Sequence, residues 1–296
     1  MINPTAGRGR TRKLLPRLER ALCQHDVAAH ISSDIADGRR IARGAFGRGE
    51  GVVACGGDGT VSALASLAAQ EGGPIAVVPT GAGNDLARQL GIDARRPLDA
   101  LALLGSGHIA RIDLGRADAA DGNSEVFTTV ANTGFDADAN RWANDVRWAA
   151  GTTLYVLALL RTVVTYRPRA MSVRVDDTTW EGSAWLVAVG NTRWYAGGMM
   201  ITPEAEIDDG LLDVCIVDDG PTIEFLWRFP RVFRGTHIAL DKVITLRGAS
   251  VEISSPDEGN ELWASGERVG PLPARLTTMA GSLPVLMPAR PSLPRR

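Results

Sequence analysis

The sequence predicts a chain of two domains, a parallel α/β domain followed by an antiparallel β-sandwich domain. Strand-like and helix-like segments alternate over the first part of the chain, which is typical of a parallel sheet covered on both faces. Short runs rich in β-branched residues dominate the rest, as in an antiparallel β domain. The 296 residues are 45% hydrophobic and suffice for two cores. The predicted domains are residues 1–112 and 113–296, and the last residues could pack back on the first domain.

The first domain begins abruptly. Ile2 is the only apolar residue between Met1 and the first turn, so either the opening strand is short or the true start lies upstream. The elements that follow are, in order, a helix carrying Leu14, Leu15, Leu18 and Leu22, a strand at 27–31, a helix at 34–46 capped by Ser33 or Asp34, a strand at 51–55, a helix at 60–69 ended by Gly72, a strand at 74–78 and a short helix at 84–90 ended by Gly91.

The second domain is predicted to be built from short strands separated by polar or Gly/Pro turns. One helical region, residues 142–166, interrupts them. The longest apolar stretch, Leu154 to Val164, is broken by Arg161 and is too short to span a bilayer. The predicted strands are residues 125–131, 171–175, 184–189, 211–217, 242–246 and 251–253.

Composition excludes several functions. The net charge of −2 argues against bulk capture of nucleic acid, so no nucleic-acid partner is expected. Among 32 basic residues only Lys13 and Lys242 are lysine, and no Gly-Lys pair of a Walker A loop exists. The three cysteines form no CxxC pair, which suits a reducing compartment and gives no thiolate metal site. A cytoplasmic protein is therefore expected.

A glycine-rich turn, Gly56-Gly57-Asp58-Gly59-Thr60, follows a predicted strand and opens a helix. Glycines let a phosphate chain approach backbone N–H groups at a helix N-terminus. A carboxylate there repels polyphosphate unless a divalent cation lies between them, so Asp58 implies Mg²⁺ with a nucleotide. The alternative is a plain βα turn in which Asp58 caps a helix.

A second turn, Pro79-Thr80-Gly81-Ala82-Gly83-Asn84-Asp85, repeats this arrangement one βα unit later. Both turns should emerge at the carboxyl edge of a parallel sheet, where ligands bind. An ordinary Asn or Asp cap is the alternative. Asn3-Pro4-x-x-Gly7 belongs to the same edge and is followed by the basic residues Arg8, Arg10, Arg12 and Lys13.

These three segments in series resemble the catalytic domain of the diacylglycerol kinase family, which includes bacterial lipid kinases and the sphingosine and ceramide kinases. The resemblance runs essentially the whole chain. The segments of the second half that share it are Asn132-Thr133-Gly134-Phe135-Asp136, Gly190-Asn191, Gly197-Gly198-Met199, Pro203-x-Ala205, Asp209-Gly210-Leu211-Leu212-Asp213-Val214 and Ser265-Gly266-Glu267.

The resemblance implies an N-terminal α/β nucleotide-binding domain, a β-sandwich lipid-substrate domain and an active site in the interdomain cleft. Asp58 would bridge to catalytic Mg²⁺ and Glu267 would accept the proton of the substrate. A structural Mg²⁺ would use the Asp209 side chain with the carbonyls of Glu206 and Leu211, although a plain hairpin turn is the alternative there. The residues it places at the nucleotide are Asn3, Ser32, Gly56, Gly57, Asp58, Gly59, Thr60, Val61, Ser62, Gly81, Ala82, Asn84 and Asp85.

The implied function is transfer of the γ-phosphate of ATP to a lipid hydroxyl, with diacylglycerol as the default acceptor. Ceramide, sphingosine and phosphatidylglycerol-type acceptors stay open, as does a homodimer. Ala82 and Ser265 stand where the family usually has a Ser or Thr and an Asp, so a catalytically weak lipid-binding regulatory protein is an alternative.

Two other nucleotide-binding enzyme classes fit the sequence less well. NAD kinase shares the first glycine turn, but Pro-x-Gly-x-x-Asn-Asp and Ser-Gly-Glu argue against it. A Rossmann enzyme would need Gly-x-Gly-x-x-Gly after the first strand. Contact with the inner face of a membrane should be peripheral, and the candidate lipid-facing residues are Trp142, Trp148, Tyr155 and Leu159.

Overall fold

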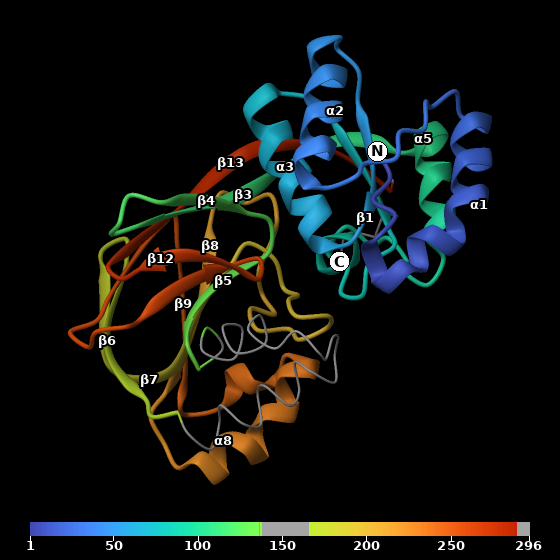
Figure 1. Ribbon diagram of the computed structural model, residues 1–296. Coiled ribbons are helices and arrows are strands. Elements are labelled where there is room, and N and C mark those ends of the chain that lie inside the picture. Colours follow the sequence, from blue (N-terminus) through green and yellow to red (C-terminus); the bar gives the residue numbers. More distant parts are fainter. Residues whose placement is uncertain (136, 138–165, 289–296) are drawn as a thin grey trace, which may run out of the picture. The chain divides into compact units, whose positions relative to one another are not determined.

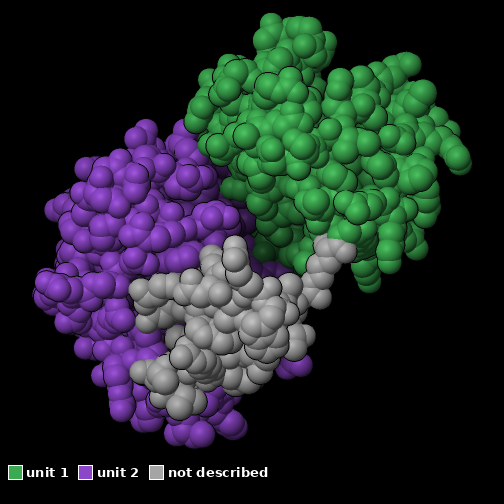
Figure 2. All heavy atoms as spheres, viewed as in Figure 1, with its two compact units in different colours: residues 1–112, 281–296 green, residues 113–280 purple. Residues whose placement is uncertain are grey.

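The computed structural model describes residues 1–135, 137 and 166–288. It divides into two compact units, Met1–Ile112 with Gly281–Arg296, and Asp113–Ala280 (Figure 2). The predicted helical region at 142–166, including Trp142, Trp148, Tyr155 and Leu159, lies outside the described residues except for Tyr166. In the described part, no helix is both long and apolar enough to cross a membrane.

Unit 1 is an α/β unit (Figure 1). Its strands β1 (Val52–Gly56) and β2 (Ile75–Pro79) pair in parallel, from Val52 opposite Ile75 to Gly56 opposite Pro79. The end of β13 (Ala274–Met287) adds a third parallel strand, with Val285 opposite Ile75. The helices are η1 (Ala6–Gly9), α1 (Arg10–Gln24), α2 (Ile35–Gly47), α3 (Asp58–Glu71), α4 (Asp85–Gln89), η2 (Pro97–Ala102) and α5 (Leu103–Ser106).

Local sequence accounts for most boundaries of unit 1. Asp34 caps α2 by accepting the N–H of Asp37 at 2.8 Å, and α3 ends at Gly72, whose φ is +75°. The strand predicted at 27–31 was wrong. Only single bridges join Ile2 to Cys55 and to Ile31, because residues 28–31 are exposed and have no apolar face to bury.

Unit 2 is built from antiparallel strands. Strands β3 (His108–Ala119) and β13 contribute residues to both units. The order is β13-β10-β6-β7-β5-β11-β12, with β8 and β9 added beside β7 and β4 beside β3. The remaining elements are β4 (Ser124–Phe127), β5 (Val130–Gly134), β6 (Arg169–Val175), β7 (Thr178–Gly190), β8 (Leu212–Asp218), α8 (Thr222–Arg228), η3 (Phe229–Arg234), η4 (Thr236–Ala239), β9 (Val243–Gly248), β10 (Ser250–Ser254), β11 (Glu261–Ala264) and β12 (Glu267–Pro271).

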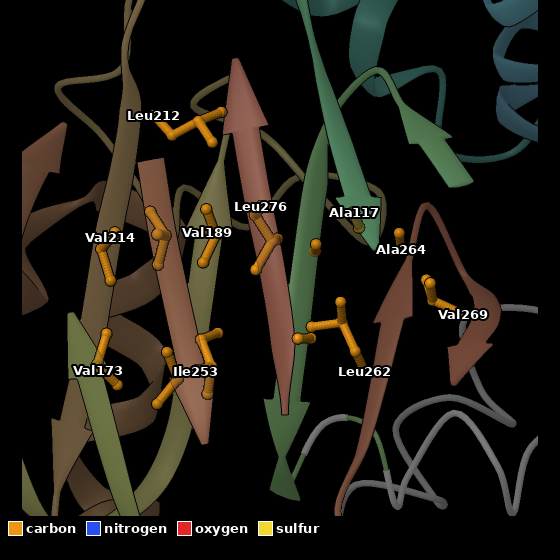
Figure 3. Packing of buried hydrophobic residues seen from close by; sticks show 14 of the residues in the cluster. Ala117, Val173, Val189, Leu212, Val214, Ile253, Leu262, Ala264, Val269 and Leu276 are labelled. Atoms are coloured by element: carbon orange, nitrogen blue, oxygen red, sulfur yellow. The ribbon is translucent and has the colours of Figure 1, made fainter. Parts of the chain in front are cut away.

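The predicted strands of unit 2 were right in type but incomplete. The strand predicted at 125–131 is two strands, β4 and β5, and four further strands, β3, β11, β12 and β13, were not predicted. The hydrophobic core of unit 2 lies between these strands (Figure 3). In β6, for example, Met171, Val173 and Val175 alternate into it and are almost fully buried.

A second apolar layer of unit 2 covers the opposite face of β7 and β8. Trp185 lies at a register shift in the β7–β8 pairing and its ring stacks on that of Phe225 in α8, 4.8 Å between centroids. Phe135 packs edge-on against both rings. This aromatic cluster fixes α8 to the sheet.

Candidate active site

The two glycine turns of unit 1 lie directly side by side. They follow β1 and β2, whose last paired residues are Gly56 and Pro79, and the N–H of Thr80 donates to Gly56 O at 2.9 Å. A Cβ on Gly81 would lie only 2.3 Å from Gly57 Cα. Neither position can accept a side chain without moving the backbone, so these two glycines are explained by the contact between the turns.

Asp58 joins the first turn to the second. Its carboxylate accepts the N–H of Asn84 at 2.8 Å on Oδ2 and the N–H of Asp85 at 2.7 Å on Oδ1. It therefore caps α4, the helix of the next βα unit, rather than its own helix. Gly83 is required to be small, because its Cβ would lie 2.6 Å from Asp58 Oδ2. An acidic residue among glycines was the only signal in the sequence for this cross-turn cap.

The side chains of Asn84 and Asp85 hold the second turn in shape. Asn84 has a left-handed backbone, with φ of 54°. Its side-chain Oδ1 accepts the N–H of Gly81 and its Nδ2 donates to Gly81 O, both at 2.8 Å. Asp85 is buried and pairs with Arg88 at 2.6 Å. Both residues are thus placed in the predicted region, with their side chains engaged inside the turn.

The N-terminus of α3 is open. In the part of the chain that the structure describes, no side chain caps it. The first N–H groups of a helix, here those of Asp58, Gly59 and Thr60, have no acceptor within the helix. Gly59 is exposed, and a Cβ there would meet no protein atom within 4 Å. Neither packing nor a positive φ requires glycine at this position. An anion bound against these N–H groups would require it.

Asn3, Ser32 and Thr60 are brought together, as the resemblance implied. Asn3 Nδ2 donates to Thr60 Oγ1 at 2.8 Å, and Asn3 Oδ1 accepts from the N–H and hydroxyl of Thr5. All three residues line one small pocket, whose other members include Asp34 and Ile35. This pocket is a candidate for the nucleoside part of a nucleotide.

Val61 and Ser62 lie deeper, in the first turns of α3. Both are buried, with exposed fractions of 4% and 8%. The N–H of Val61 donates to Gly57 O. Ala82, by contrast, is exposed at the tip of the second turn.

A hydroxyl pair beneath the second turn was not predicted. Thr11 Oγ1 donates to Thr80 Oγ1 at 2.7 Å, and both residues are fully buried. Gly7 approaches the same residue, since its φ is +59° and a Cβ there would lie 2.2 Å from Thr80 O. The Asn3-Pro4-x-x-Gly7 segment therefore supports the second turn, and Gly7 was the signal for it.

In unit 2, Glu267 stands at a sharp hairpin between β11 and β12. It is the exposed first residue of β12. The turn residues Ser265 and Gly266 both have positive φ, 51° and 86°, as a two-residue type I′ hairpin requires. The hydroxyl of Ser265 is buried and has no hydrogen-bond partner among the described residues.

The Asp209 turn of unit 2 is crowded with acidic groups. Asp209 Oδ1 accepts the N–H of Leu211 at 3.0 Å, and its other oxygen pairs closely with Arg247. The pKa of Asp213 is raised to about 6, mainly by burial; Arg247 lowers it, and the charges of Asp209, Glu204 and Glu206 contribute to the rise. Gly210 has φ of +77° and forms a turn with Asp209, but this turn lies in the long connection from β7 to β8, so the plain hairpin considered as the alternative was wrong. In the described residues, no three acidic, His or Cys side chains form a metal cage.

An apolar pocket lies in unit 2 under α8. It holds about 730 Å³ of empty space, part of it open to solvent. Charged side chains stand among its lining, Glu224, Arg228 and Lys242. Sequence reasoning missed this pocket, because its walls come from strands and helices far apart in the chain. Its apolar lining includes Phe135, Trp185, Phe225, Phe229, Val232 and Leu240.

Comparison with known proteins identifies both halves. The diacylglycerol kinase catalytic domain matches residues 1–117. The YegS C-terminal NAD kinase β-sandwich-like domain matches residues 129–287.

Whole-chain relatives agree. A diacylglycerol kinase of Mycobacterium tuberculosis is 36% identical over 265 residues, covering 89% of this chain and 85% of its own. A YegS-like lipid kinase of Pseudomonas aeruginosa is 30% identical over 270 residues, with the same coverage. A crystal structure of a diacylglycerol kinase from Bacillus anthracis has the same fold, with a TM-score of 0.71 at 18% identity, covering 97% of this chain and 94% of its own.

Proposed function

The chain belongs to the diacylglycerol kinase family of lipid kinases, and from this premise we propose that it phosphorylates diacylglycerol, giving phosphatidic acid. The phosphoryl donor of the family is ATP. The observation that carries the proposal is the open N-terminus of α3 beside the second glycine turn. Several relatives are named diacylglycerol kinase, which makes diacylglycerol the first acceptor to test.

The triphosphate of ATP would bind against the N–H groups that begin α3. Gly59 leaves room there, and the partial positive charge of the helix end favours an anion. Asp58 keeps the second turn pressed against the first, so these N–H groups are fixed before the nucleotide arrives. The nucleoside would extend toward the pocket of Asn3, Ser32 and Thr60.

The residues around Asp58 fit a Mg²⁺ ion that is held mainly by the nucleotide. Each oxygen of Asp58 accepts one backbone N–H and keeps a second lone pair for a cation. Mg²⁺ is commonly bound through one or two carboxylates together with substrate phosphates and water. When bound, it would neutralise charge on the phosphates.

We assign the role of proton acceptor to Glu267. The catalytic step needs such an acceptor within reach of the lipid hydroxyl. The hydroxyl oxygen bonds to the γ-phosphorus as the bond from that phosphorus to the bridging oxygen breaks, and ADP leaves. The hydroxyl proton passes to the Glu267 carboxylate. An exposed carboxylate directly after a two-residue type I′ turn suits this role, because it is accessible to a substrate and its backbone is held by the β11–β12 pairing.

The acyl chains of the lipid would occupy the apolar pocket under α8. Apolar side chains line most of it, and several of them are aromatic, as is usual for ligand pockets. An apolar pocket of this kind accepts the chains of ceramide or sphingosine as well. Selectivity between these acceptors and diacylglycerol must therefore come from contacts with the head group. A cytoplasmic enzyme at the inner membrane face would have access to both ATP and the lipid.

We also propose a structural Mg²⁺ at the Asp209 side chain and the carbonyls of Glu206 and Leu211. The support is an excess of negative charge, since the charges of Glu204, Glu206 and Asp209 all act on Asp213, and Arg247 pairs with Asp209 and Asp213. Asp213 Oδ2 is buried and accepts no hydrogen bond from the described residues, with Arg247 Nε 3.5 Å away. A divalent cation would compete with Arg247 for Asp209, and a rise in Tm on adding Mg²⁺ without nucleotide, lost in Asp209→Asn, would support the site.

The test is incubation with γ-labelled ATP and Mg²⁺, using mixed micelles that contain each candidate lipid, followed by identification of the labelled product. Label in phosphatidic acid is the expected result. Label in a product of ceramide, sphingosine or phosphatidylglycerol would identify that lipid, in place of diacylglycerol, as the acceptor. No label in any lipid, with lipid binding intact, would favour a regulatory lipid-binding protein, and label in NAD would favour a soluble-substrate kinase.

A further inference from the structure

The outer face of α8 and η3 is apolar and exposed. Among the described residues six large hydrophobic side chains are exposed, and three of them fall in this short segment. Ile223 is 75% exposed, Trp227 79% and Phe233 53%. Single exposed apolar residues are ordinary on a protein surface, but a tryptophan with two such neighbours in eleven consecutive residues is not.

Packing does not account for these three side chains, because the segment is held by its other face. Phe225 stacks on Trp185, and Phe229 and Val232 line the apolar pocket. Ile223 and Trp227 are four residues apart, so they share the opposite face of α8. Figure 1 shows α8 outside the strands of unit 2. The segment is thus apolar toward the sheet and apolar toward solvent.

Two cations lie among the exposed apolar residues. Arg231 and Arg234 are exposed, and neither has an ion-pair or hydrogen-bond partner among the described residues. Arg228, in contrast, is paired with Glu224 and Asp241. We call the set Ile223, Trp227, Arg231, Phe233 and Arg234 the α8–η3 surface. Its unbalanced charge is positive.

We propose that the α8–η3 surface docks on an anionic lipid bilayer. The proposal rests on the proposed function in one respect only, that the substrate is a lipid held in a membrane. Tryptophan at the interface, aliphatic and aromatic side chains below it and arginines at the head groups form the usual composition of an interfacial segment. Each arginine near an anionic surface adds attraction that falls off within a Debye length.

A second copy of the chain is a poorer occupant. In a two-fold dimer the same patch meets itself, which would bring Arg231 and Arg234 of both copies together. Three exposed apolar side chains also cover far less than the roughly 800 Å² per partner that a stable interface buries. A bilayer needs neither shape complementarity nor opposite charge on the same chain.

Docking there would also bring the apolar pocket to the bilayer. Phe225, Arg228 and Phe229 line the pocket and alternate along the segment with Ile223 and Trp227, which face solvent. A lipid chain leaving the membrane at this segment would pass from one apolar surface to another. The surface therefore serves access to the lipid as well as attachment.

The experiment is flotation of the full chain with vesicles of phosphatidylcholine, with and without phosphatidylglycerol. We expect binding to the anionic vesicles, weakened roughly tenfold or more in Ile223→Gln/Trp227→Gln, which removes two exposed apolar side chains. Arg231→Glu/Arg234→Glu should weaken it comparably and remove its salt dependence. The matched control is Ile109→Gln, since Ile109 is also an exposed apolar residue, 59% exposed, in β3. It should bind as the parent does.

Two further readouts separate the outcomes. Tm should be unchanged in all variants, and phosphorylation of a short-chain lipid dispersed without vesicles should also be unchanged, so a loss on vesicles alone supports the surface. Equal binding of parent and both double variants overturns it, whatever the lipid assay shows. A shift from dimer to monomer in Ile223→Gln/Trp227→Gln by sedimentation equilibrium overturns it in favour of a second copy. If the parent protein phosphorylates no lipid but its vesicle binding still depends on these residues, the proposed function is refuted and the α8–η3 surface remains supported.

Discussion

The carboxylate of Asp58 accepts the backbone N–H of Asn84 at 2.8 Å, across two successive βα units. The neighbouring N–H of Asp85 donates to the other oxygen. One side chain therefore ties both glycine turns together, which is a structural task separate from any contact with a cation. Changing Asp58 should affect folding and catalysis together, and the two effects can be measured apart.

Asp58→Ala should lower lipid kinase activity by orders of magnitude and also destabilise the protein. Two backbone N–H groups at α4 lose their acceptor, and an unpaired donor of this kind costs about 1–3 kcal/mol. Urea unfolding gives the stability and a labelled-ATP assay gives the rate. Asp93→Asn is the control, because Asp93 is exposed and its carboxylate, as far as the described residues go, pairs with Arg95 alone. Near-normal turnover of Asp58→Ala would refute both the cation role and the positioning role.

Gly59→Ala should impair nucleotide binding without destabilising the fold. The new methyl group meets no protein atom within 4 Å, so stability should be unchanged or rise by about 0.4–1 kcal/mol through the unfolded chain. The same methyl group would occupy the space proposed for a phosphate, and we expect the KM for ATP to rise roughly tenfold or more. Gly105→Ala is matched, since Gly105 is also helical, exposed and open around its Cβ position. An equal KM for ATP in the two variants would refute the proposal that a phosphate binds at the N-terminus of α3.

Glu267→Gln should lower kcat by about 10²–10⁴-fold if Glu267 accepts the proton. The side chain is exposed at the hairpin, so Tm should not change. Arg268→Gln, next in the chain and also exposed, is the control. A normal kcat in Glu267→Gln would show that another group accepts the proton.

Ser265→Asn should stabilise the β11–β12 hairpin and leave the rate almost unchanged. Ser265 has φ of 51°, and Asn and Asp adopt this left-handed conformation more readily than serine. The measurement is Tm together with kcat/KM for lipid. A large gain in activity, beyond what added stability explains, would mean that an acidic or amide group at this position takes part in the reaction.

Asp213 should make the protein less stable as the pH rises from about 4 to about 6. Burial raises its pKa to about 6 in the folded state, from 3.8. In that interval the folded protein holds more protons than the unfolded chain, so stability falls with increasing pH and is not recovered above it. Asp213→Asn should flatten this segment of the Tm profile and raise Tm at neutral pH. Added Mg²⁺ should reduce the difference between parent and variant, if a cation binds at the Asp209 turn.

Much of the first domain could be predicted from local pattern. The cap at Asp34, the stop at Gly72 and the fully buried β1 each follow from a few neighbouring residues. The strand at 27–31 was mispredicted because its apolar residues alone did not reveal that residues 28–31 would be exposed and joined to Ile2 by a single bridge at Ile31. β11 and β12 were missed because they are short, and β5, the strand that joins this pair to the rest of the sheet, is far away in sequence.

The sequence by itself determined the family, the two glycine turns and the residue types that a phosphate-binding turn requires, because these are local properties of adjacent residues. Tertiary structure alone decided what each side chain does. Asp58 proved to be the cap of the next helix because parallel pairing of β1 and β2 brings residues 26 positions apart into hydrogen-bonding distance. It likewise decided that α8 presents one apolar face to Trp185 and another to solvent, since burial depends on which surfaces the folded chain brings together.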